Sequence, residues 1–138
     1  MSGIISLINL NNEPVNQSLL RGITDYMAFR GLDARQIWHK DNIGFGHTLL
    51  RTTSEQEGEK QPFTLNERVW IAADIRLDGR KNLVIALQAR GRVVDENRPD
   101  VELLLHAYHV WDTACVEHLQ GDFVFIIWDE RQQRLFCG

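Results

Sequence analysis

The segment Gly121–Asp129 constrains the fold of this chain more than any other, because it is a near-continuous apolar run of Phe, Val, Ile and Trp. A run of this length and composition is typical of a buried β-strand. Polar turn residues separate it from Arg134–Cys137, which predicts an antiparallel hairpin. Turn-like sequences between apolar runs predict two further hairpins, at residues 35–39 with 43–50 and 63–65 with 69–77.

The remaining segments predict one more strand, three helices and one loop. Residues 3–10 are a β-branched apolar run, and Asn16 is placed to cap a helix that Gly31 ends. We expect helices at residues 80–90 and, with the Asp100 carboxylate as its cap, from residue 100 onward. Residues 51–61 are polar and aperiodic, so we expect an exposed, solvated loop. This order predicts an α+β fold with helices layered on antiparallel sheet, and two stacked sheets if the hairpins cannot all join one.

Length, charge and cysteine content exclude several classes of protein. The chain has 138 residues, which is room for one domain, 1–138, with a core. A net charge of −4 argues against a nucleic-acid partner. No apolar stretch reaches the roughly 18–20 residues of a membrane span, and no basic segment precedes the N-terminal apolar run, so we expect a cytoplasmic protein without membrane contact. Cys115 and Cys137 lack metal-site spacing, and we expect no metal and two reduced thiols.

Four stretches carry motifs that together span the chain. It starts Met-Ser-Gly-Ile; Gly46-His47 is followed at a distance by Gln61-Pro62; residues 71–80 read IAADIRLDGR; and PDVEL at 99–103 precedes LQGDFVFIIWD at 119–129. These motifs resemble those of the N-terminal glutaminase domain of asparagine synthetase-like enzymes, the class II glutamine amidotransferases. The Gly-Asp-Phe motif is the most specific. The Asp-x-Arg-Leu-Asp-x-Arg motif is similar to that of glutaminase-degenerate members such as β-lactam synthetases and lasso-peptide cyclases.

The resemblance implies a fold, a reaction and a set of roles. The fold is the N-terminal-nucleophile hydrolase sandwich, with two antiparallel sheets between helix layers. In such enzymes the free α-amine of a residue-2 cysteine acts as base for its own thiol, which attacks glutamine and releases ammonia. An oxyanion hole, a cation for the substrate carboxylate and a carboxylate for its amine complete the site.

Three of the four corresponding positions depart from that pattern. Ser2 replaces the cysteine, and its amine is free only if Met1 is removed, as is usual before a small residue. Asp74 and Ile75 replace the Asn-Gly pair of the oxyanion hole, so an acceptor stands in place of a donor. Leu49 replaces the cation, for which Arg51 is a substitute candidate, and Asp100 alone matches its counterpart.

The leading interpretation is therefore a catalytically degenerate glutaminase-like domain that supports a synthetase domain, in cis or in trans. That synthetase would use ATP and magnesium to form an amide in a small molecule or peptide; these 138 residues lack its Ser-Gly-Gly-x-Asp-Ser pyrophosphate loop, so no cofactor is expected here. One alternative is an active Ser2 amidohydrolase that releases ammonia from glutamine. A second is an unrelated α+β binding or structural module in which the four tryptophans are only core.

Two further expectations concern a charged strand and the chain end. Asp74, Arg76 and Asp78 share one strand face, so we expect Arg76 to bridge both carboxylates; the alternative is a role for these residues in contact with a substrate or a second domain. The apolar strand that ends at Cys137 leaves an edge open, which suggests that the natural chain continues and that the isolated piece pairs through this edge, as a homodimer for example.

Overall fold

The computed structural model describes residues 1–52 and 54–138. Thr53, within the predicted loop, lies outside the described residues. The helices and strands in chain order are β1 (Gly3–Ile8), α1 (Gln17–Tyr26), β2 (Ala34–Lys40), β3 (Ile43–Leu49), β4 (Phe63–Thr64), β5 (Val69–Leu77), α2 (Arg80–Ala89), α3 (Asp100–Trp111), β6 (Gly121–Asp129) and β7 (Arg134–Cys137). Three 3₁₀ segments, Met27–Arg30, Ser54–Gln56 and Asp112–His118, lie between them.

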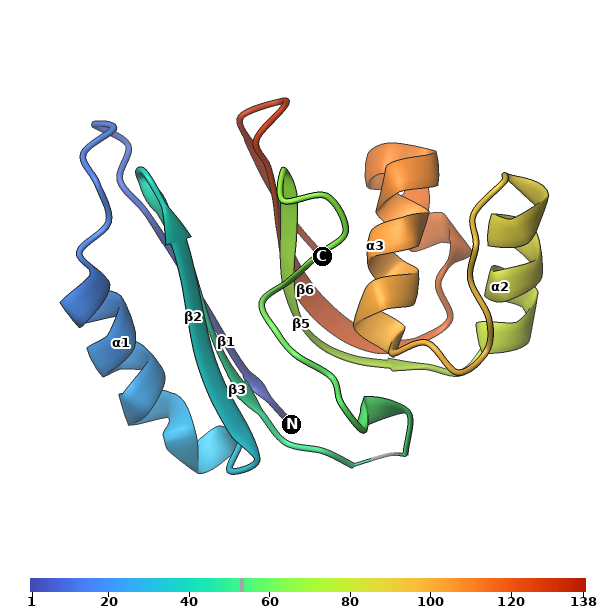
Figure 1. Cartoon of the computed structure of the whole chain (residues 1–138), viewed down its shortest axis with the longest axis horizontal. Coiled ribbons are helices and arrows are strands. Elements are labelled where there is room, and N and C mark those ends of the chain that lie inside the picture. The colour runs from blue at the N-terminus through green and yellow to red at the C-terminus, as the bar shows by residue number, and fades with distance from the viewer. Residues whose placement is uncertain (53) are drawn as a thin grey trace.

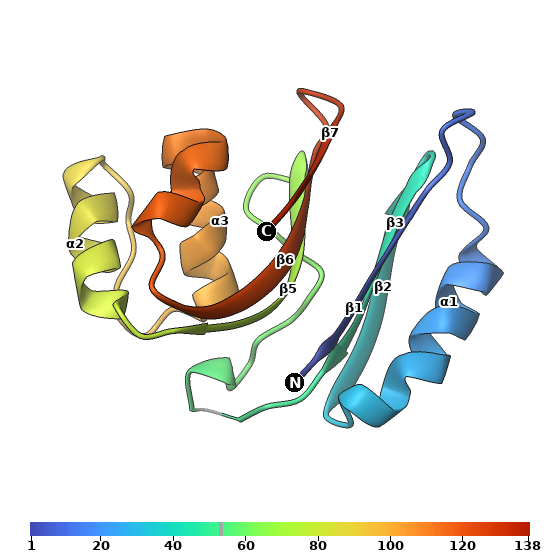
Figure 2. The ribbon, with the colours of Figure 1, turned by 180° about the vertical axis from the view of Figure 1, so that it is seen from behind.

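The strands form two antiparallel sheets that pack face to face. The first has the order β1-β3-β2 and the second the order β4-β5-β6-β7. Helix α1 covers the outer face of the first sheet, α3 covers the outer face of the second, and α2 packs against α3 (Figures 1 and 2). This arrangement confirms the predicted α+β fold with two antiparallel sheets between helix layers. All three predicted hairpins are present.

Strand β3 is buried along its whole length because α1 covers one face and the second sheet covers the other. Two glycines allow the helix to come close. A Cβ at Gly44 would lie 2.7 Å from Leu20 Cδ2, and one at Gly46 would overlap Thr24 Oγ1. Glycine at both positions leaves room for Leu20 and Thr24 of the helix.

The inner faces of the two sheets share a small aromatic core. Phe45 of β3 packs with Ala72 and Trp128 of the second sheet. Trp38 of β2 stacks on Trp70 of β5, with ring centroids 4.5 Å apart and planes at 19°. The alternate residues of β5 and β6 face α3 and α2 and form the larger core, which includes the buried, free Cys115, whereas free Cys137 is exposed.

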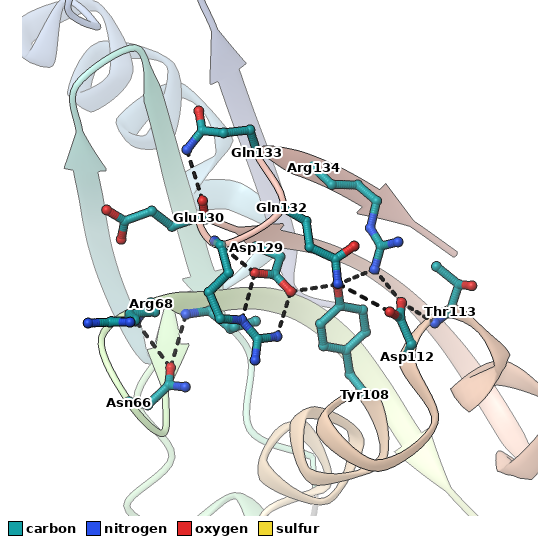
Figure 3. A network of polar contacts seen from close by, with 12 residues as sticks. Asn66, Arg68, Tyr108, Asp112, Thr113, Asp129, Glu130, Gln132, Gln133 and Arg134 are labelled. Carbon is teal, nitrogen blue, oxygen red and sulfur yellow. Dashed lines mark hydrogen bonds and ion pairs between the residues drawn. The ribbon is translucent and has the colours of Figure 1, made fainter.

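A polar network fastens the C-terminal hairpin to α3 (Figure 3). Asp129, which is fully buried, accepts hydrogen bonds from Arg131 Nη2 at 2.6 Å and from the Tyr108 hydroxyl at 3.1 Å. Arg134 donates to the same hydroxyl at 2.6 Å and pairs with Asp112. Burial acts to raise the pKa of Asp129, but these hydrogen bonds outweigh it and the pKa is lowered. Asp129, the last residue of the LQGDFVFIIWD stretch, is therefore a structural anchor.

Most predicted element positions are correct, with shifts at the ends. Asn16 caps α1 as predicted, through a hydrogen bond from Leu19 N to its side chain, but the α-helix ends at Tyr26 and a 3₁₀ turn completes the path to Gly31. Strand β1 ends at Ile8, earlier than predicted. The described part of the chain contains no helix that is both long and apolar enough to cross a membrane.

The predicted role of Asp100 as a helix cap is wrong. Asp100 is the first residue of α3, whose N-cap is Pro99 and has no side-chain hydrogen bond. Its carboxylate instead accepts from Leu77 N, at the end of β5, at 2.9 Å and pairs with Arg80. Arg80 also donates to two backbone carbonyls of the segment before α3, Glu96 O and Arg98 O. Asp100 and Arg80 together tie the starts of α2 and α3 to the end of β5.

We predict that Arg80→Ala lowers the free energy of unfolding by about 3–5 kcal/mol, because it leaves the buried Asp100 carboxylate without its cation. Urea denaturation measures this loss. Arg35→Ala is the matched control: Arg35 pairs with Asp25 at the surface, so its loss is expected to cost about 0–1 kcal/mol. Equal losses for the two variants would contradict the anchoring role of Arg80.

Candidate functional site

Ser2 lies just before the start of β1, where the first sheet meets the inner face of the second sheet. It is 6% exposed and directly precedes β1. Its backbone N–H donates to Asp74 Oδ1 of β5 at 3.0 Å, and its hydroxyl oxygen accepts from Leu50 N at 3.1 Å. The two sequence-predicted residues Ser2 and Asp74, 72 positions apart, are therefore in direct contact.

The backbone before Asp74 is held by two buried side chains that are not among the sequence-predicted site residues. Gln61 accepts from Ala73 N at 2.6 Å and donates to Ala73 O at 3.0 Å. His47 Nε2 lies 3.0 Å from the same carbonyl oxygen. Because a carbonyl oxygen can only accept hydrogen bonds, Nε2 of His47 is assigned as the donating, protonated ring nitrogen. Both residues belong to motifs that carried the family resemblance, which was the available signal for their importance.

Glu59 is a buried carboxyl group behind this contact. It is 3% exposed and accepts from Gln61 Nε2 at 2.6 Å, while Oε2 has no hydrogen-bond partner among the described residues. Burial raises the pKa of Glu59; the hydrogen bond from Gln61 and the charge of Arg51 oppose the rise, and the charge of Asp74 adds to it. The expectation of a merely solvated loop is thus wrong for Gln56, Glu59 and Gln61, which are buried.

A pocket of about 480 Å³ opens beside the Ser2–Asp74 contact. Strands β5 and β6 supply one wall, with Asp74 and Arg76 from the first and Asp122 from the second. Met1 and Leu50 also line the pocket, and Leu50 N donates to the Ser2 hydroxyl. A ligand in this pocket would meet carboxylates, one guanidinium and an apolar lining.

Arg76 forms a different set of ion pairs from the predicted one. Its Nε lies 3.5 Å from Asp78 Oδ1, as expected, but its Nη2 lies 3.0 Å from Asp122 Oδ2 on the neighbouring strand. The predicted bridge to Asp74 is wrong, because Asp74 Oδ1 is directed to Ser2 N. The carboxyl group of Asp74 therefore lies beside the chain's second residue.

The other two candidate residues lie away from the pocket lining. Arg51 is exposed; its backbone N–H donates to Asp33 Oδ2 at 2.7 Å and its Nε to Gln56 O at 3.3 Å. The Asp100 carboxylate is occupied by Leu77 N and Arg80. The structure brings Ser2 and Asp74 together at the pocket, whereas Arg51 and Asp100 are not part of its lining. Among the described residues, no group of three or more metal-ligating side chains could hold a metal ion.

The burial of His47 leads to a prediction about how folding stability depends on pH. Burial lowers its pKa to about 4, against the opposing effects of the Ala73 hydrogen bond and the Asp74 charge. Between about pH 6.5 and pH 4 the unfolded chain binds a proton at His47 that the folded chain does not, so stability falls as pH falls, by up to about 1.4 kcal/mol per pH unit. His47→Gln keeps a donor and removes the titration, and we expect a shallower pH dependence in urea denaturation at pH 7, 6 and 5.

The exposed His39 provides the control for this measurement. His39→Gln is expected to keep the wild-type pH dependence. If His47→Gln loses as much stability on acidification as wild type, His47 is not neutral in the folded chain.

Comparisons of the sequence with known proteins identify the family of this chain. The family model described as "Glutamine amidotransferase domain" matches residues 1–138. "Asparagine synthetase [glutamine-hydrolyzing] 3" of Bacillus subtilis is 32% identical over 100% of this chain and 23% of that protein. "Amidase chry2" of Gibberella zeae is 31% identical over 83% of this chain and 17% of that protein. The chain thus spans about a fifth of the length of these relatives.

A solved structure shares the fold. The glutamine phosphoribosylpyrophosphate amidotransferase of B. subtilis, solved with ADP and GMP, superposes with a TM-score of 0.50 at 21% identity, over 67% of this chain and 22% of that one. The alternative of an unrelated module is therefore overturned. On the match over its whole length, the chain belongs to the glutamine amidotransferase domain family.

Proposed function

We propose that this chain is a glutaminase-like domain that does not hydrolyse glutamine and serves as a scaffold for an ATP-dependent, amide-forming synthetase domain or partner. The contact between Ser2 N and Asp74 Oδ1 carries this proposal. It puts a carboxylate beside the residue that would attack the substrate. Family membership supports the scaffold part, and the side chains at the site support the loss of hydrolysis.

The first argument concerns the developing oxyanion. Attack on an amide produces a negatively charged oxygen that needs hydrogen-bond donors. Asp74, at the position where the resemblance places a donor amide, is an acceptor when ionised and would repel that charge. Ile75 follows it where the resemblance places a glycine, and a β-branched residue lacks the backbone freedom of a glycine at that position.

The second argument concerns the nucleophile. A serine hydroxyl is far less acidic than a thiol and depends more on a well-placed base. Here the hydroxyl oxygen accepts from Leu50 N, and the adjacent nitrogen donates to Asp74. While Met1 is attached, that nitrogen is an amide and has no basic lone pair.

The third argument concerns recognition of an amino-acid substrate. Asp100, the candidate partner for the substrate amine, is already satisfied by Leu77 N and Arg80. Arg76 lines the pocket but pairs with Asp78 and Asp122. To bind a substrate amine as the resemblance implies, Asp100 would have to give up these partners, and a carboxylate in the pocket would have to displace the ion pairs of Arg76.

The proposed partner is a synthetase that activates a carboxylate with ATP and magnesium to close an amide in a small molecule or peptide. The fact that the chain covers only 23% of a glutamine-hydrolysing asparagine synthetase supports a larger second part. We place this pair in the cytoplasm, for which the two free cysteines are suited.

Intact mass and glutamate release test the loss of hydrolysis. Protein made from the natural start is weighed to establish whether Met1 is present, and a sample beginning at Ser2 is assayed with glutamine. We expect no glutamate above the level of Ser2→Ala. Glutamate release that depends on Ser2 would overturn the proposal in favour of an active amidohydrolase with Ser2 as its nucleophile.

The scaffold part is tested in the ATP-dependent amide-forming enzyme to which the domain contributes. We expect amide formation to survive Ser2→Ala and to be lost when residues 1–138 are deleted. Survival of the deletion would contradict a scaffold role.

A further inference from the structure

Removal of Met1 would convert the nitrogen of Ser2 from an amide to an amine, with Asp74 still beside it. In the present chain it is an amide N–H that donates to Asp74 Oδ1 at 3.0 Å. Without Met1 the same atom is a primary amine that can take up a proton. With Met1 attached, Ser2 is 6% exposed, so Asp74 is the partner of its nitrogen in place of water.

We propose that Asp74 holds the α-amino group of Ser2 as an ammonium ion once Met1 is removed, so that the group which would act as base is kept protonated. The inference rests on the proposed loss of glutamine hydrolysis and names the residue that enforces it. Asp74 acts through the amine of Ser2 and is a positioning residue.

The chemistry follows from charge and distance. A base must offer an unshared electron pair, and an ammonium ion has none. An opposite charge within about 4–6 Å favours the charged form of a titrating group, and the carboxylate oxygen lies at hydrogen-bond distance from the nitrogen. The hydroxyl of Ser2 would then face an acid in place of a base.

The other charged groups around the contact leave this attraction in place. His47, on β3, is neutral near pH 7 because burial lowers its pKa to about 4. Burial raises the pKa of Glu59, on the loop before β4, which favours its neutral form. Arg76, on β5, directs its guanidinium to Asp78 and to Asp122 of β6. Arg51, which follows β3, is exposed and donates through Nε to Gln56 O.

The titration of the amine itself tests the proposal. The full chain is released from a fusion whose protease leaves Ser2 as the first residue, labelled with ¹⁵N-serine, and its α-amino resonance is followed by NMR from pH 5 to pH 10. We expect the acid dissociation constant of this ammonium to be at least about tenfold smaller in wild type than in Asp74→Asn. Burial of Ser2 is common to both proteins, so the difference isolates the carboxylate.

Asp122→Asn is the matched control, because Asp122 lines the same pocket but its carboxylate pairs with Arg76 instead of Ser2. Its amine is expected to titrate as in wild type. Equal titration of wild type and Asp74→Asn, or an equally large change in Asp122→Asn, would overturn the proposal. Should Asp74→Asn fail to fold, Asp74→Ser supplies the same comparison.

This readout separates the two proposals. Glutamate release by wild type would overturn the loss of hydrolysis whatever the titration shows. Absence of glutamate together with an unperturbed amine would overturn the role of Asp74 and leave the degenerate domain in place.

Discussion

The burial of β3 on both faces is the constraint on which the rest of this structure depends. One face must accept α1 at short range, and Gly44 and Gly46 allow that approach. The other face must meet a second sheet, and its Phe45 and His47 reach the inner face of β5. A strand that is covered twice brings the first residues of β1, its neighbour, against the second sheet. The Ser2–Asp74 contact is a consequence of that packing.

Most of the fold could be predicted because the strands and helices differ in local pattern. The apolar run Gly121–Asp129 and the turn after it define the last hairpin, and the Asn16 cap defines the start of α1. The role of Asp100 could not be predicted in this way. An acidic residue before an apolar helix has the pattern of a cap, and only the folded chain brings Leu77 N and Arg80 to its carboxylate.

The site was predictable in part. Ser2 and Asp74 could be named from motifs. Their hydrogen bond could not be predicted, because it joins two sheets and no local sequence pattern indicates it. The same applies to Arg76, whose second ion pair goes to Asp122 on the adjacent strand and not to Asp74 on its own. The prediction from composition is least accurate in the loop before β4. Its polar sequence predicts exposure, but Glu59 and Gln61 are buried. Polar residues are buried when backbone groups are available to satisfy them, and that depends on tertiary structure.

The side chain of Gln61 extends the second sheet beyond the short strand β4. Strand β4 pairs with β5 only at Ile71 and Trp70, and the amide of Gln61 then bonds both the N–H and the C=O of Ala73, as a neighbouring strand would. An exposed strand edge invites pairing with another chain, and this side chain closes the edge at that residue. The Gln61 side chain also fixes the peptide unit before Asp74. The same amide therefore protects the edge from pairing with another chain and aligns the site.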